Sequence, residues 1–202
     1  MQAVETETII LYHTDLRGEW PEEAARALAT RLPYAKRLAA GGSSARARES
    51  LAGIALALRA LSAVTCREVH PGELVFPQGG KPYLTRTRGA GTEEQADFSI
   101  AHSTPFVGCA ALARGRVGLD IEVGDGAALA YRVAREAALK AAGLTLAAYP
   151  QVELEADAAR CGGERWHAHA LADFAGASAC LMTSRRVARL EARAIALAEL
   201  FR

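Results

Sequence analysis

Two acidic residues, Asp120 and Glu122, share one face of a predicted strand. In the segment RVGLDIEVGD (116–125), apolar residues alternate with other types, which is the period of a β-strand. Side chains two apart on a strand point the same way, about 6–7 Å apart, so two carboxylates there repel each other unless a cation lies nearby. The pair therefore fits either the solvated face of an edge strand or a site for a hard divalent ion such as Mg²⁺.

Other polar residues interrupt the apolar pattern elsewhere. They are Lys81 in a glycine-rich turn, His102 and Ser103 after a strand, and Arg135, Glu136 and Lys140 on a helix. Glu136 and Lys140 are four positions apart, so they share one helix face. Each feature alone has an ordinary explanation as a helix ion pair, a turn or a solvated side chain. Together, three carboxylates for a metal and several cations for phosphate suit a metal-bound pyrophosphate ester.

The elements that must position these residues follow from periodicity and from helix-breaking residues. Helices are predicted at 20–32, 45–63 and 126–143, and strands at 7–15, 96–103, 149–157, 165–173 and 176–184. Residues 105–122 predict two strands joined by a turn at Arg114-Gly115, which is a hairpin signal. The last segment, 185–200, is consistent with either a strand or a helix.

The order of these elements predicts the α+β fold class. A helix and several strands occur twice along the chain, which suggests two similar halves, residues 1–122 and 123–202. Each half is expected to be a helix packed on a small, mostly antiparallel sheet, the two being related by a pseudo-twofold.

Composition narrows the class of protein. The chain has 202 residues, half of them hydrophobic, and a formal net charge of +1, which argues against a general nucleic-acid binder. The four cysteines match no zinc or redox spacing and predict reduced thiols. The N-terminus has no signal-peptide pattern, and no segment reaches the roughly 20 apolar residues of a membrane span. These features predict a cytoplasmic protein without a membrane partner.

Four short blocks, in order, carry a family resemblance. GGKPYL (79–84), FSIAHS (98–103), VGLDIE (117–122) and REAALKAAG (135–143) resemble the signature blocks of the 4′-phosphopantetheinyl transferases, of the longer, Sfp-like type with two fused halves. These enzymes move phosphopantetheine from coenzyme A to a serine of an acyl or peptidyl carrier protein. The resemblance implies Mg²⁺, coenzyme A and a carrier protein as partners, and a monomer with a pseudo-dimeric fold.

The resemblance also implies roles for the matching residues. Asp120, Glu122 and Glu136 would bind Mg²⁺, and Glu136 would also be the general base for the carrier serine. Lys140 would bind the pyrophosphate and assist the leaving group. The coenzyme A contacts would come from Lys81 and His102 at the adenosine-3′-phosphate end, together with Ser103, Arg135 and Arg48.

The chain departs from the family pattern in the connection between its third and fourth blocks. The segment between Asp120 and Glu136 is short, Arg132 stands where the family has tryptophan, and Arg135 replaces a lysine. Two alternatives therefore stay open. One is a non-catalytic relative that binds coenzyme A or a carrier protein, and the other is a different metal-dependent enzyme acting on a pyrophosphate ester.

Overall fold

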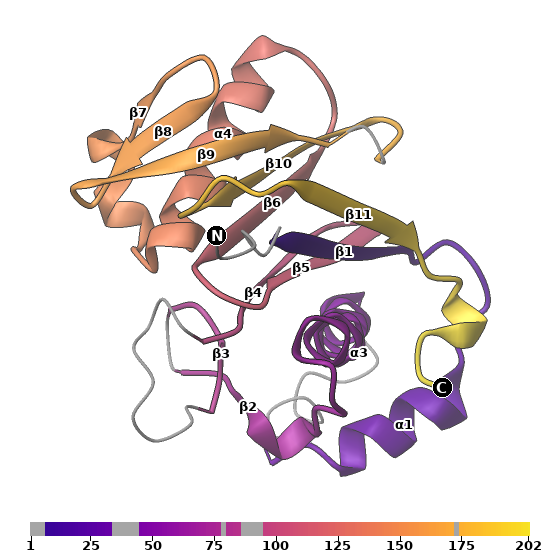
Figure 1. Ribbon diagram of the computed structural model, residues 1–202. Helices are drawn as coiled ribbons and strands as arrows, with labels where there is room; N and C mark the ends of the chain where they lie inside the picture. The colour runs from indigo at the N-terminus through magenta and orange to yellow at the C-terminus, as the bar shows by residue number, and fades with distance from the viewer. Residues whose placement is uncertain (1–6, 34–44, 78–79, 86–94, 172–173) are drawn as a thin grey trace.

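The chain folds into two β-sheets, each covered by a long helix (Figure 1). The structure, a computed structural model, describes residues 7–33, 45–77, 80–85, 95–171 and 174–202. The predicted α+β class is confirmed, with helices packed on small, mainly antiparallel sheets. The similarity of the two halves stays a prediction.

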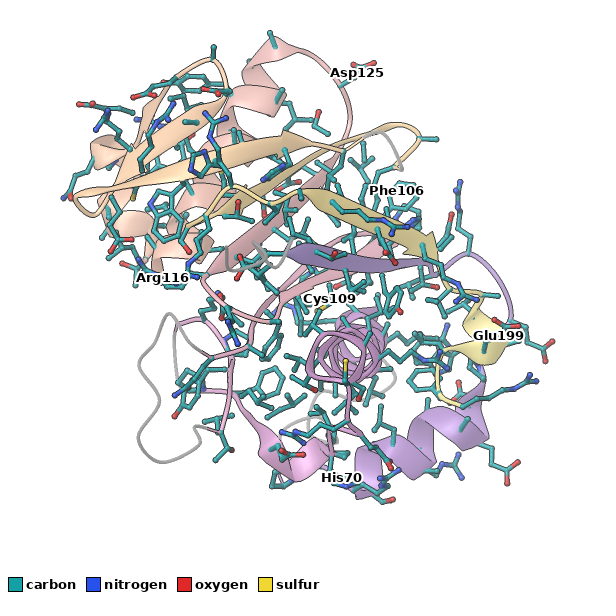
Figure 2. All side chains as sticks on the ribbon, viewed as in Figure 1. His70, Phe106, Cys109, Arg116, Asp125 and Glu199 are labelled. Carbon is teal, nitrogen blue, oxygen red and sulfur yellow. The ribbon has the colours of Figure 1, made fainter. Side chains whose placement is uncertain are left out.

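The first sheet has the order β11-β1-β5-β4 and is covered by α3. Its strands are β1 (Thr8–Asp15), β4 (Asp97–Ser103), β5 (Phe106–Leu112) and β11 (Arg189–Ala194), and only β1 and β11 run parallel. The helix α3 (Ala45–Thr65) packs small apolar side chains on this sheet, and α1 (Glu22–Thr30) packs against α3. Cys109 of β5 lies in this core, beside α3 in Figure 2.

The second sheet has the order β6-β10-β9-β8-β7 and is wholly antiparallel. Its strands are β6 (Val117–Val123), β7 (Glu153–Leu154), β8 (Ala158–Cys161), β9 (Glu164–Ala170) and β10 (Ala177–Thr183). The helix α4 (Ala127–Ala142) packs on this sheet and ends at Gly143, whose φ of 69° is left-handed, as a helix C-cap requires.

Short elements complete the fold. They are the 3₁₀ helices η1 (Pro71–Glu73), η3 (Leu146–Gln151) and η4 (Leu197–Glu199), and the two-stranded ribbon of β2 (Leu74–Val75) with β3 (Tyr83–Leu84). The C-terminal segment, for which the sequence allowed strand or helix, is thus the strand β11 followed by a 3₁₀ turn. In the part of the chain that is described, no helix has the length and apolarity needed to cross a membrane.

The alternation of apolar and other residues predicted for β6 gives this strand two different faces, each turned to a different layer of the molecule. Val117, Leu119 and Ile121 are buried in the core between the two sheets. The opposite face, with Gly118, Asp120 and Glu122, looks toward α4. The layers are therefore α3, first sheet, second sheet and α4, and the acidic pair lies between β6 and α4 rather than on a solvated outer surface.

The hairpin predicted for residues 105–122 is wrong in its pairing, although both strands and the turn exist. β5 has β1 on one edge and β4 on the other, so no edge is left for β6. β6 instead crosses to the second sheet and pairs with β10. Since β11 also returns to the first sheet, sheet membership does not coincide with the division at residue 122.

Side chains of β4 connect the two sheets where their edges meet. Asp97, Ser99 and Ser103 accept hydrogen bonds from three backbone N–H groups of β6, those of Val117, Leu119 and Val123, at 2.8–3.0 Å. The three acceptors on β4 and the three donors on β6 thus have the same spacing, two residues and then four. The edge of β6 is therefore joined to β4 by hydrogen bonds to side chains, and not by backbone pairing of the two strands.

Replacing Ser99 with alanine should destabilise this junction. Ser99 is only 2% exposed and Leu119 is fully buried, so the Leu119 N–H would lose its acceptor inside the protein. An unsatisfied buried donor costs about 1–3 kcal/mol. Chemical denaturation of Ser99→Ala measures the loss. Ser103→Ala is the control and should lose less, because its partner Val123 is 46% exposed and water can replace the hydroxyl.

Candidate active site

A cavity of about 530 Å³ lies between β4 and the glycine-rich turn on one side and β6 and α4 on the other. It is lined by six of the residues that the sequence singled out: Lys81, His102, Asp120, Glu122, Glu136 and Lys140. Two of them, Lys81 and His102, precede Val117, and the other four come from β6 and α4. The fold therefore brings residues of all four sequence blocks to one place.

Asp120 is the most buried acid of the cavity, with 4% of its surface exposed. The Lys140 ammonium donates to its Oδ1 atom at 2.6 Å. Its Oδ2 atom is buried and has no hydrogen-bond partner among the described residues. Burial raises the pKa of Asp120, and the charge of Lys140 offsets part of that rise. One oxygen of this carboxylate is thus available for a further ligand.

Glu136 and Glu122 complete the acidic group. Burial raises the pKa of Glu136, and the negative charge of Asp120 raises it further. A carboxylate in this position takes up a proton more readily than an ordinary glutamate does. Glu122 is half-buried, and its Oε2 atom accepts a hydrogen bond from the Ser103 hydroxyl at 3.3 Å, while the Arg132 guanidinium lies 3.7 Å from Oε1.

Lys81 reaches the cavity wall, but its ammonium is already bound. It donates to the Asp97 carboxylate and, at 2.7 Å, to the carbonyl oxygen of Val117. The Lys81 side chain is 14% exposed, and burial lowers its pKa. Because Asp97 also accepts from the Val117 N–H, this pair fastens the glycine-rich turn and β4 to the start of β6.

We expect Lys81→Met to lower the free energy of unfolding by about 3–5 kcal/mol, because it leaves the largely buried Asp97 carboxylate without its cation. Thermal and urea denaturation would measure this. The double variant Lys81→Met/Asp97→Asn should recover much of the loss, because no unpaired charge remains. A double variant as unstable as the sum of the single ones would contradict an ion pair between these two residues.

The structure adds Glu49, which the sequence interpretation did not include. This α3 residue is buried, accepts a hydrogen bond from the Thr104 hydroxyl, and has Oε2 3.4 Å from Nδ1 of His102. It therefore orients the imidazole that lines the cavity. A signal was present, because Glu49 occupies a buried position on the otherwise apolar face of α3.

Three predicted residues do not line the cavity: Ser103, which donates to Glu122 behind its wall, and two arginines that lie farther away. The Arg135 guanidinium donates to the carbonyl oxygen of Val152 and stacks on Tyr131 and Tyr149, with ring centroids at 5.2 and 4.6 Å. Arg48 on α3 forms an ion pair with Glu22 at 3.3 Å and lies over the ring of Trp20. Neither arginine lies with the acids or lines the cavity, so the cavity does not support their predicted contact with coenzyme A.

The acids match a hard divalent ion in chemistry, since carboxylate oxygens are the ligands that Mg²⁺ prefers. The unpartnered Oδ2 of Asp120 is a donor atom ready for such an ion. Within the described residues, however, no three His, Cys, Asp or Glu side chains are already gathered as a metal-binding group. The candidate ligands Asp120, Glu122 and Glu136 would have to close around an ion.

A scan against protein-family models found no matching family, and a search of curated proteins found no match either.

Proposed function

We propose that this protein transfers the 4′-phosphopantetheine group of coenzyme A to a serine of an apo acyl or peptidyl carrier protein, with Mg²⁺. The observation that carries the proposal is the single cavity that contains the three acids, Lys140, Lys81 and His102. The four ordered sequence blocks resemble those of the 4′-phosphopantetheinyl transferases and supply the substrate class.

In this proposal Glu136 takes the proton of the carrier serine. The serine oxygen then forms a bond to the β-phosphorus of coenzyme A, and the bond from this phosphorus to the bridging oxygen breaks to release 3′,5′-adenosine bisphosphate. The raised pKa of Glu136 suits a base, because its carboxylate holds the proton more firmly than an ordinary glutamate. His102, oriented by Glu49, offers a ring nitrogen to a phosphate oxygen.

Lys140 balances the negative charge that develops on the phosphoryl oxygens and on the leaving bisphosphate. Its ammonium lies on Asp120 and can turn to the pyrophosphate, since 34% of its side chain is exposed. Asp120, Glu122 and Glu136 would hold the divalent ion, which when bound polarises the phosphoryl oxygens. The neutralised acids would then no longer repel the anionic substrate.

The direct test incubates the protein with coenzyme A, Mg²⁺ and a panel of apo carrier proteins, and measures the mass of each carrier. A gain equal to one phosphopantetheine group on a serine supports the proposal. If no carrier gains mass and coenzyme A also stays intact, the proposal is wrong. Loss of coenzyme A without a modified carrier would instead indicate hydrolysis of the pyrophosphate ester.

A second candidate is a non-catalytic protein that binds coenzyme A or a carrier. The observation in its favour is that the acids of the described chain are not assembled as a metal group. Calorimetry with coenzyme A separates the two, because this candidate predicts binding without transfer. It also predicts that Glu136→Ala leaves binding and biological activity intact.

A further inference from the structure

One face of α4 carries three charged residues, Arg132, Glu136 and Lys140. They are spaced four residues apart, so they lie above one another along the helix. The neighbouring strand β6 carries Asp120 and Glu122 on the side that faces α4. Cations and acids therefore alternate on this face of the helix, opposite two acids on the strand.

Each acid of β6 has its own cation from α4. Lys140 Nζ lies 2.6 Å from Asp120 Oδ1, and Arg132 Nη2 lies 3.7 Å from Glu122 Oε1. Glu136 lies between the two cations on the helix, and both of their charges lower its pKa, against the larger effects of burial and Asp120. The cluster thus holds three carboxylates and two permanent counter-charges from the same helix.

We propose that Arg132 is an internal counter-cation that competes with a divalent ion for Glu122 and so weakens metal binding at this site. The inference rests on the metal site of the proposed function. Arg132 is suited to this role because a guanidinium is a cation that can bind carboxylate or phosphate oxygens through two N–H groups. The Arg132 side chain is 49% exposed and the Glu122 side chain 36% exposed, so the guanidinium can leave without disturbing the core.

Arg132 lies 3.7 Å from Glu122 Oε1, so a cation bound to that carboxylate would have a like charge close by. Two unit like charges about 4 Å apart weaken binding by about fivefold even in water. An ion bound to Glu122 would be repelled by Arg132 until the guanidinium moves away. Once displaced, the guanidinium can fork onto phosphate oxygens, which a tryptophan at this position could not do.

The experiment measures Mn²⁺ binding directly, by the electron paramagnetic resonance signal of free Mn²⁺, with no substrate present. The variants are Arg132→Gln, which removes the charge, Arg132→Lys, which keeps it, and Arg135→Gln as matched control. Arg135 lies on the same helix, but its guanidinium contacts Val152. Circular dichroism checks that each variant is folded.

We expect Arg132→Gln to bind Mn²⁺ about fivefold to tenfold more tightly than the wild type, which is the effect of about 1 kcal/mol of repulsion. Arg132→Lys and Arg135→Gln should stay within about twofold of the wild type. Unchanged or weaker binding in Arg132→Gln overturns the inference, as does the same tightening in Arg135→Gln. Absence of Mn²⁺ binding in both the wild type and Arg132→Gln overturns it too.

This readout is independent of the proposed transfer reaction. Tighter Mn²⁺ binding by Arg132→Gln, together with no modified carrier, would keep the inference and remove the proposed function. Transfer by the wild type, together with equal Mn²⁺ affinities for all variants, would keep the function and remove the inference.

Discussion

Replacing Glu136 with glutamine should lower phosphopantetheine transfer by about 10²–10⁴-fold, the usual contribution of a general base. Glutamine has nearly the same shape but cannot accept the serine proton. It also removes one of the three carboxylates proposed to hold the metal. Because Glu136 is only partly buried and glutamine occupies nearly the same volume, the fold should not change. Transfer is measured as carrier mass against time at saturating coenzyme A.

The control for this variant is Glu23→Gln, an exposed glutamate on α1 far from the cavity in sequence and lining none of its wall. It should retain the wild-type rate. Calorimetry should show that Glu136→Gln still binds coenzyme A in the absence of metal, since Lys140 and His102 are unchanged. A Glu136→Gln enzyme with full activity would show that another group takes the proton.

Replacing Gly118 with alanine should destabilise the protein by about 3 kcal/mol or more and reduce activity with it. A Cβ atom here would lie far closer than 3.0 Å to the backbone of α4, at the carbonyl oxygen of Ala137 and the nitrogen of Ala141. Backbone atoms of a packed helix cannot move aside as a side chain can, so the helix must shift away from β6. The result is measured by thermal and urea denaturation.

The activity of Gly118→Ala should fall because Glu136 and Lys140 lie on α4 next to the two contacted residues. A shift of the helix carries both away from Asp120. Gly72→Ala, in the 3₁₀ helix η1, is the control, since its φ is not left-handed and an added Cβ would meet no atom within 4 Å. Alanine is also the better helix former, so this variant should stay within about 1 kcal/mol of the wild type. Equal stability of the two variants would contradict close packing at Gly118.

Local pattern predicted most elements of this fold. Periodicity predicted the strand at 7–15 and the helices at 20–32, 45–63 and 126–143. The last of these helices ends at Gly143, whose φ is left-handed. Pairing was predicted less well, because it depends on which edges are free. The hairpin signal at Arg114-Gly115 is local, whereas β1 and β4 occupy both edges of β5. The strand β11 was undecided because it adds to a sheet built from residues far earlier in the chain.

The candidate site was also predicted well in some residues and wrongly in others. The sequence blocks identified Asp120, Glu122, Glu136 and Lys140, which line one cavity. Arg135 was assigned a coenzyme A contact because it matches a lysine of the fourth family block, yet it lies next to Glu136, and adjacent helix positions point about 100° apart. The structure accordingly places its guanidinium on Val152.

The sequence by itself determined that Asp120 and Glu122 share one strand face, and that Glu136 and Lys140 share one helix face, because both follow from fixed backbone periods. Only the tertiary structure decided which cation meets which acid. The Lys140–Asp120 and Arg132–Glu122 contacts depend on how closely α4 approaches β6. That approach is possible because Gly118 has no side chain where the helix backbone crosses the strand, a contact between segments that no local period encodes.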